Sequence, residues 1–313
     1  MFNILKKEEL SEHVTLFEIE ARDIARKAKP GNFFMLRTHE EGERVPLTIA
    51  DFDRGRGTIT AVFQKVGKAT HHLGTFKEGD FIPDVVGPLG NHSHIKNFGR
   101  VVCVGGGVGI APVYPIAKAL KEAGNKVTSI IGARSKSILF WEEKMRNVSD
   151  DLIITTDDGS HGTKALVTAP LEDILSNEKV DLVVAIGPAI MMKFVCKTTE
   201  KYKVKTTVSL NSIMIDATGM CGGCRVDVGG ETKYTCVDGP EFDGHEVDFD
   251  LLMKRLQAYV TEENTAMIRS GKKGKPAVTG NLEKFIPVYR VNGGELKIPG
   301  RPDPTDRERR LNK

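Results

Sequence analysis

The feature that most constrains the fold is a short segment rich in cysteine and glycine. Three of the five cysteines, Cys221, Cys224 and Cys236, fall inside sixteen residues, and Gly222 and Gly223 separate the closest pair. Thiols this close in sequence converge on one point only if the backbone turns tightly around it, and glycine permits such turns. The sequence therefore predicts a small loop domain, residues 213–243, that wraps a bound metal group.

The ligand pattern favours an iron–sulfur cluster. The spacing C-x4-C-x2-C…C is typical of plant-type [2Fe–2S] loops, and here an aspartate stands in place of the first cysteine. Thiolates also bind zinc, but zinc does no redox chemistry, and a zinc site of one aspartate and three cysteines is uncommon. A zinc knuckle and reduced structural thiols remain the alternatives. The predicted ligands are Asp216, Cys221, Cys224 and Cys236.

Residues 99–212 show the alternation of an α/β domain with a doubly wound parallel sheet. Short apolar segments alternate with helical ones. The first apolar segment runs into Gly105-Gly-Gly-Val-Gly-Ile-Ala-Pro112, which opens a helix. Glycines and a helix N-terminus suit a dinucleotide pyrophosphate, although a glycine-rich turn without ligand is the alternative. The predicted dinucleotide contacts are Gly105, Gly107, Gly109, Ala111, Pro112, Gly187 and Pro188.

The choice between NAD and NADP stays open at this stage. Arg134 lies near the end of the second apolar segment, where NAD-binding domains carry an acid, and this favours NADP. Asp157 and Asp158 end the next segment and would repel a 2′-phosphate while accepting hydrogen bonds from ribose hydroxyls, which favours NAD. An ordinary surface turn is the alternative for the two aspartates.

Residues 1–98 predict an antiparallel β-barrel, because short alternating segments are separated by turn clusters. Nicotinamides deliver two electrons and clusters accept one, so a flavin is expected between them, in this barrel. Each candidate loop is also compatible with an ordinary barrel turn. The candidates are Arg44, Pro46, Leu47 and Thr48 beside the flavin ring, and Gly67, Thr70, Gly87, Pro88, Leu89 and Gly90 beside the phosphates.

Composition argues against several classes of protein. The net charge of +3 over 313 residues gives no bulk charge for binding nucleic acid or membranes. No stretch offers the roughly 20 apolar residues of a membrane span, and the first ten residues lack the apolar core of a signal peptide. The odd cysteine count then predicts reduced thiols and a cytoplasmic location. Cys103 and Cys196 lie in apolar segments and are expected to be buried.

Residues 244–313 are predicted to hold one helix and then a basic, irregular tail. The helix should cover residues 249–260 with Asp248 as its N-cap. Beyond residue 271 the chain is rich in Lys, Arg, Gly and Pro, and we expect this part to contact a partner.

These motifs in this order resemble the ferredoxin-reductase-like electron-transfer subunits. Residues 209–225 and 236–243 are similar to the small subunit of NADH-dependent reduced ferredoxin:NADP+ oxidoreductases, also described as sulfide dehydrogenases. The electron-transfer subunit of dihydroorotate dehydrogenase is similar as well, but that family uses four cysteines. The resemblance covers residues 1 to about 265.

The resemblance implies FAD, a [2Fe–2S] cluster with an aspartate ligand, and an NAD(H) site. It implies a large partner that resembles the glutamate synthase small subunit and carries [4Fe–4S] clusters, through which ferredoxin is reached by electron bifurcation. Leu47 and Thr48 would face the flavin ring, and Gly67 with Thr70 would hold the FAD phosphates. Arg44 departs from the family pattern, because it precedes Thr48 by four residues instead of three.

No protein acid or base is expected in the chemistry, because the cofactors carry it. Two other functions stay open. One is an NAD-linked subunit that delivers electrons to another acceptor, such as dihydroorotate dehydrogenase or sulfur and polysulfide. The other is a non-catalytic redox sensor.

Overall fold

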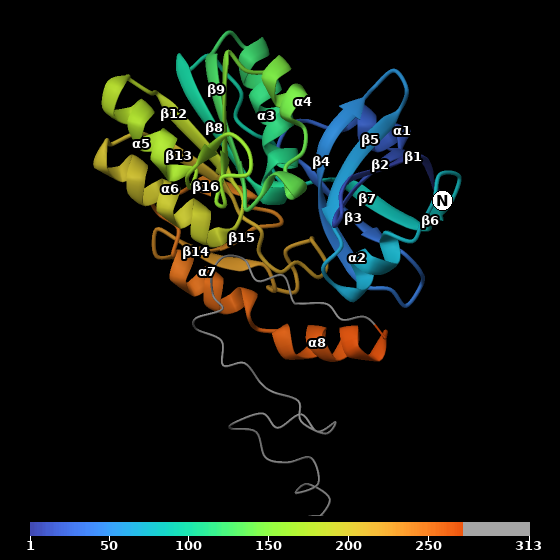
Figure 1. Ribbon diagram of the computed structural model, residues 1–313. Helices are drawn as coiled ribbons and strands as arrows, with labels where there is room; N and C mark the ends of the chain where they lie inside the picture. Colours follow the sequence, from blue (N-terminus) through green and yellow to red (C-terminus); the bar gives the residue numbers. More distant parts are fainter. Residues whose placement is uncertain (272–313) are drawn as a thin grey trace, which may run out of the picture. The chain divides into compact units, whose positions relative to one another are not determined.

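The N-terminal part of the chain is a nearly closed antiparallel barrel, as predicted. The computed structural model describes residues 1–271, and the predicted basic tail beyond them lies outside the described residues. The strand order is β6-β1-β2-β5-β4-β3-β7 (Figure 1). The strands are β1 (Phe2–Ser11), β2 (Val14–Glu20), β3 (Phe33–Arg37), β4 (Arg44–Asp53), β5 (Thr58–Gln64), β6 (Phe81–Ile82) and β7 (Asp84–Leu89).

Large apolar side chains at alternating positions fill this barrel. Phe17, Phe34 and Phe63 are fully buried, and the rings of Phe17 and Phe63 meet edge to face with centroids 5.1 Å apart. Two short helices, α1 (Arg22–Lys27) and α2 (Lys68–Leu73), lie in the connections between strands. They add Ile24 and Leu73 to the same core. The barrel therefore has a core of its own.

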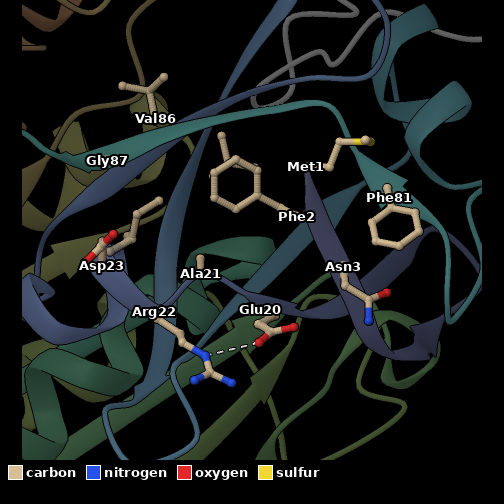
Figure 2. A pocket seen from close by; sticks show the side chains of 12 residues that line it. Met1, Phe2, Asn3, Glu20, Ala21, Arg22, Asp23, Phe81, Val86 and Gly87 are labelled. Atoms are coloured by element: carbon tan, nitrogen blue, oxygen red, sulfur yellow. Dashed lines mark hydrogen bonds and ion pairs between the residues drawn. The ribbon is translucent and has the colours of Figure 1, made fainter.

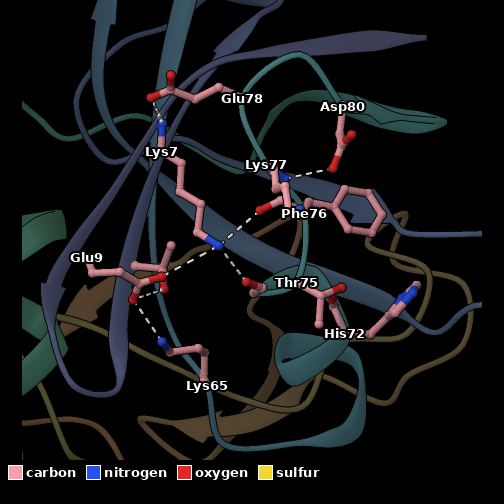
Figure 3. Close-up of polar contacts among 11 residues, drawn as sticks. Lys7, Glu9, Lys65, His72, Thr75, Phe76, Lys77, Glu78 and Asp80 are labelled. Carbon is pink, nitrogen blue, oxygen red and sulfur yellow. Dashed lines mark hydrogen bonds and ion pairs between the residues drawn. The ribbon is translucent and has the colours of Figure 1, made fainter.

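Polar contacts attach the segment around α2 to strand β1 (Figure 3). Lys7 Nζ donates to the carbonyl oxygens of Gly74 (2.7 Å) and Phe76 (3.0 Å), and the backbone N–H of Lys7 donates to Glu78 (2.9 Å). On the other side of α2, Lys65 Nζ donates to Glu9 at 2.7 Å. Both ends of this segment are thus held to one strand, which fixes the loop that carries the predicted flavin contacts Gly67 and Thr70.

The second domain is a doubly wound sheet in the order β11-β10-β9-β8-β12-β13-β16. Its neighbouring strands are parallel except for the last pair, β13 and β16. The antiparallel edge strand β16 was not foreseen from the sequence. The strands are β8 (Arg100–Gly106), β9 (Lys126–Ala133), β10 (Asp151–Thr156), β11 (Thr163–Lys164), β12 (Leu182–Ile186), β13 (Thr206–Ser209) and β16 (Glu241–Asp243).

Helices cover both faces of this sheet, which explains why its strands are apolar throughout. Val102 and Val104 point to one face, into a core that includes residues of α5 and α6, whereas Val101 and Cys103 point to the other, into a core that includes residues of α3 and α4. Cys103 is fully buried, as expected, and burial raises its pKa to about 12. The helices are α3 (Ile110–Glu122), α4 (Glu142–Asn147), α5 (Thr168–Asn177) and α6 (Ala189–Lys201).

The remaining described chain holds a small hairpin and two helices. The hairpin consists of β14 (Arg225–Val228) and β15 (Glu231–Tyr234). The predicted N-cap is confirmed, because Asp248 accepts the backbone N–H of Leu251 at 2.9 Å. The predicted single helix over 249–260 is wrong, since α7 (Phe249–Leu256) ends early and α8 (Val260–Arg269) follows. No helix within residues 1–271 combines the length and apolarity needed to cross a membrane.

Candidate functional site

The glycine loop lies where the carboxyl ends of two parallel strands meet. Strand β8 ends at Gly106, one 3-10 turn covers Gly107–Gly109, and α3 begins at Ile110. A Cβ at Gly109 would lie only 2.3 Å from the carbonyl oxygen of Ile186, at the end of β12. The predicted contacts Gly105, Gly109 and Gly187 therefore converge at one sheet edge, the usual place for a ligand in such folds.

The other predicted members of the glycine loop have different surroundings. Gly107 has φ +56°, and a Cβ there would meet no atom within 4 Å, so this position is open to a ligand. Ala111 is buried in the core with α3, and Pro112 follows it in the first turn of that helix. Pro188 directly precedes α6.

The charged candidates gather at the ends of the two next strands. The backbone N–H groups of Asp157 and Asp158 donate to the carbonyl oxygens of Ala133 (3.1 Å) and Arg134 (3.2 Å). Burial raises the pKa of Asp157 although the charge of Arg134 opposes it. Hydrogen bonds from Ser160 lower the pKa of Asp158. Sequence reasoning missed Ser160, whose hydroxyl also accepts the N–H of Lys136 at 2.8 Å.

Three adjacent barrel strands bring part of the flavin candidates together. Thr48 on β4 is the register partner of Phe33 on β3, and Phe33 is in turn the partner of Leu89 on β7. Gly90 follows with φ +70°, and a Cβ there would lie 2.7 Å from the ring of Phe33. Thr48, Leu89 and Gly90 thus flank one residue, with Leu47 and Pro46 continuing along β4 and Gly87 and Pro88 along β7.

The other flavin candidates, Arg44, Gly67 and Thr70, are not among the residues that flank Phe33. Arg44 is the first residue of β4 and pairs with Arg37, four positions from Thr48. The hydroxyl of Thr70 accepts the N–H groups of Val66 and Gly67, both at 3.0 Å. The Thr70 hydroxyl thus stabilises the loop to which it belongs. A Cβ added at Gly67 would meet no atom within 4 Å.

A recess of about 630 Å³ opens elsewhere on the barrel (Figure 2). It is bordered by Phe2, Phe81, Val86 and the start of α1, with Gly87 as the one predicted flavin residue in its lining. This recess is therefore not the meeting point of Thr48, Leu89 and Gly90.

The four predicted metal ligands lie in one segment as two adjoining pairs. The carboxylate of Asp216 accepts the backbone N–H groups of Thr218 and Cys221, both at 2.9 Å. The sulfurs of Cys224 and Cys236 are 3.2 Å apart, and both residues are buried. No three His, Cys, Asp or Glu side chains within residues 1–271 are arranged to hold a metal ion. Two pairs, not a closed four-ligand cage, are what the described chain contains.

The chemistry of this segment nevertheless fits an iron–sulfur cluster. Burial, together with the adjacent Cys224, raises the pKa of Cys236 to about 12, so the Cys236 thiol loses its proton only when it binds a cation. Ala217, Gly219 and Gly222 have φ values of 60°, 80° and 66°, the left-handed backbone of a tight turn, which glycine adopts freely and which strains only Ala217. Three sulfurs and one carboxylate on such a turn match the donors that the predicted cluster requires.

One buried apolar cluster joins the cysteines to the barrel. It contains Phe33 and Met35 of β3 together with Ala217, Cys224 and Cys236. Phe33 is also the residue that Thr48 and Leu89 flank. Phe33 therefore lies beside predicted flavin residues and in the same apolar cluster as the buried pair of sulfurs.

Two family models match the chain, and they fall on two of these regions. The oxidoreductase NAD-binding domain matches residues 103–197. The iron–sulfur cluster binding domain of dihydroorotate dehydrogenase B matches residues 211–248. Together with the barrel, they define an NAD(H)-dependent oxidoreductase subunit with a ferredoxin-reductase-like fold.

Individual relatives cover most of the chain. The dihydroorotate dehydrogenase B (NAD(+)) electron transfer subunit homolog of Thermotoga maritima is 50% identical over 266 residues, 85% of this chain and 94% of the relative. The electron transfer subunit of Clostridium perfringens is 31% identical and covers 71% of this chain and 88% of its own length. The chain belongs to the family of dihydroorotate dehydrogenase B-type electron-transfer subunits.

Solved structures agree with this membership. A chain from the NADH-dependent reduced ferredoxin-NADP oxidoreductase, solved to understand flavin-based electron bifurcation, is 49% identical with a TM-score of 0.83; the match covers 87% of this chain and 98% of that one. Phthalate dioxygenase reductase, at 17% identity and a TM-score of 0.55, shares the fold.

The comparisons confirm the predicted cofactors and class. The chain is an NAD(H)-dependent oxidoreductase subunit with FAD and a [2Fe–2S] cluster, and its homologues are electron-transfer subunits of a larger complex with a partner subunit. The residue assignments at each site stay predictions.

Proposed function

We propose that this chain is the electron-transfer subunit of an electron-bifurcating NADH-dependent ferredoxin:NADP+ oxidoreductase. The 49% identity to a chain of such an enzyme, over 98% of that chain, supports the proposal. The observation that carries the proposal is Asp216, which lies beside Cys221. At this ligand position, a resemblance to the dihydroorotate enzymes would require a fourth cysteine.

The protein's part in this function is to hold and orient the groups that react. When bound, FAD exchanges a hydride with NAD(H) and single electrons with the cluster. The loop from Gly105 to Gly109 would receive the dinucleotide pyrophosphate at the start of α3. Leu47 and Thr48 would lie beside the flavin ring, and the acidic pair Asp157 and Asp158 supports NAD(H) over its phosphorylated form.

The two pairs of side chains suggest how the cluster is held. Asp216 and Cys221 would bind one iron, and Cys224 and Cys236 would bind the other. Asp216 and the exposed Cys221 would then lie on the outer side, and the buried pair would lie against Phe33 and Met35. In this proposal the buried sulfur ligands lie on the side of the predicted flavin.

We propose that the partner docks over the exposed side of the cluster segment. Apolar side chains beside Cys221 are open to solvent there, with Met220 88%, Ile215 46% and Val237 41% exposed. Exposed apolar side chains gathered in one place are typical of interaction sites. The proposed partner is a large flavoprotein that resembles the glutamate synthase small subunit and carries [4Fe–4S] clusters, with ferredoxin reached through it in the cytoplasm.

The ligand assignment is tested by replacing Asp216 with cysteine. Asp216→Cys should keep the [2Fe–2S] signal of the reduced protein and change its midpoint potential, because a thiolate replaces a carboxylate on the iron. The measurement is a redox titration followed by electron paramagnetic resonance. Asp238→Cys is the matched control, since Asp238 lies in the same segment and accepts the N–H of Tyr234 at 2.6 Å. Equal potentials for Asp216→Cys and the wild-type protein would exclude Asp216 as a ligand.

A second candidate function is electron delivery to a dihydroorotate dehydrogenase, which the names of the relatives favour. The partner separates the two candidates. Tagged chain purified from its native host should bring down a large flavoprotein with [4Fe–4S] clusters. A partner that oxidises dihydroorotate would support the second candidate. Absence of NADH-driven dye reduction by the holo-subunit would support a redox sensor.

A further inference from the structure

Two arginines hold consecutive carbonyl groups of the turn between Cys221 and Cys224. Arg225 Nη1 donates to the carbonyl oxygen of Gly222 at 3.0 Å, and Arg255 Nη2 donates to that of Gly223 at 3.1 Å. Arg225 directly follows Cys224, whereas Arg255 comes from α7, 32 positions beyond Gly223 in sequence. A turn between two predicted ligands is thus fixed from its own strand and from a separate helix.

The two guanidinium groups repel each other at this place. Burial lowers the pKa of Arg255, and the charge of Arg225 lowers it further, while the sulfur of Cys224 acts in the opposite direction. Neither arginine forms an ion pair with a carboxylate of residues 1–271, although most arginines of the barrel do. Two like charges at neighbouring carbonyl groups, without a carboxylate partner, favour the binding of a negative group beside them.

The proposed cluster is such a group. Two ferric ions, two sulfides, three thiolates and one carboxylate sum to a net negative charge, and one added electron makes it more negative. Nearby positive charge stabilises the reduced form more than the oxidised form. Cluster potentials depend on net charge and on hydrogen bonding around the site.

We propose that Arg225 and Arg255 are positioning residues that hold the turn between Cys221 and Cys224 and raise the reduction potential of the [2Fe–2S] cluster. This inference rests on the proposed function, because it takes the cluster to be bound at these cysteines. Charge and position act together: Arg255 links the turn to α7, so a change in that helix would reach the cluster through one side chain.

The test is a redox titration of the holo-protein followed by electron paramagnetic resonance. Arg255→Gln keeps a hydrogen-bond donor and removes the charge, so we expect the ratio of reduced to oxidised cluster at a fixed potential to fall about tenfold, a shift of about 59 mV to lower potential. Lys254→Gln is the matched control, because it removes one positive charge from the neighbouring position of α7, and it should shift the potential far less. Arg225→Gln should act in the same direction as Arg255→Gln.

Arg255→Lys keeps the positive charge, so it distinguishes an effect of that charge on the potential from a purely structural role of Arg255. A potential close to the wild-type value, with iron content retained, supports the proposal even if Arg255→Gln loses iron. A potential for Arg255→Gln that moves no further than that of Lys254→Gln overturns it, as does a shift for Arg255→Lys equal to that for Arg255→Gln. If wild-type protein prepared without oxygen lacks a diiron signal, the proposed function fails and the inference fails with it. If the signal is present but the arginine variants have unchanged potentials, only the role proposed for Arg225 and Arg255 is refuted.

Discussion

The NAD-binding sheet and the cluster segment form their sites in opposite ways. In the sheet, β8 and β12 are buried on both faces, and backbone packing alone brings Gly109 against Ile186. In the cluster segment, buried apolar contacts are few, and a carboxylate and two guanidinium groups hold the backbone. Apolar packing therefore forms the nucleotide site in advance, whereas the metal site depends on coordination for its final geometry.

The largest expected effect is the loss of a buried sulfur ligand. Cys224→Ser should abolish the [2Fe–2S] signal and lower electron transfer to one-electron acceptors more than 100-fold, on the order of the effect of removing an essential redox centre. The sheet should be unaffected, so NADH binding should persist. Iron analysis and NADH titration measure the two regions separately. Cys196→Ala, which changes a buried thiol of α6 outside the predicted ligand set, is the control and should retain iron. Loss of NADH binding in Cys224→Ser would show that the two regions are not independent.

A matched pair of glycines tests the preformed nucleotide site. Gly109→Ala would place a Cβ 2.3 Å from the carbonyl oxygen of Ile186, so we expect a loss of about 3 kcal/mol in the free energy of unfolding and weaker NADH binding. Gly107→Ala meets no atom and only strains φ, at about 1 kcal/mol. Denaturant unfolding and NADH titration give both quantities. Equal losses for the two variants would contradict a packing origin of the site.

The smallest expected effect concerns Glu241, on the strand where the cluster segment rejoins the sheet. Ser93 Oγ of the barrel donates to Glu241 at 2.5 Å, but burial raises the pKa of this carboxyl more than that bond lowers it. The folded state therefore favours the protonated form, and this contribution to stability is present below the unfolded pKa and is lost as pH rises through the folded pKa.

Glu241→Gln should consequently gain stability relative to the wild-type protein as pH rises from 5 to 8, by up to about 1–2 kcal/mol, the scale of one buried hydrogen bond. Thermal unfolding of the holo-protein across this range measures it. Ser93→Ala removes the donor and should make the wild-type trend steeper. A stability difference that is constant with pH would show that Glu241 is not buried as a neutral acid.

Periodicity and spacing predicted most of the architecture, because those signals are local. The alternation of apolar segments predicted both sheets, and the spacing of Cys221, Cys224 and Cys236 predicted the metal segment. Strand β16 was missed because three residues carry no period and their pairing with β13 is set by the returning chain. The break between α7 and α8 was missed because residues 257–259 contain neither glycine nor proline.

The roles within the site depended on contacts that no local pattern encodes. Spacing predicted four ligands, but not that Cys224 and Cys236 are buried while Cys221 is exposed. Arg255 lies 32 residues from the carbonyl that it holds, and nothing in the sequence of α7 distinguishes it from Lys254. Phe33 gave no signal as the residue between Thr48 and the cysteines, because its neighbours come from two other strands, β4 and β7, and from the cysteine segment.

The bond from the Leu210 N–H to the Pro240 carbonyl oxygen, at 2.9 Å, has a consequence for how such subunits diversify. The polypeptide leaves the sheet after β13 and returns to it as β16 at the neighbouring position. Residues 211–239 are thus an exchangeable cassette whose two ends are already joined. The equivalent piece of a four-cysteine relative could replace it if it supplies apolar side chains for Val226 and Val228, which belong to the core of the nucleotide-binding sheet. One scaffold could then serve acceptors of different electrochemical demand.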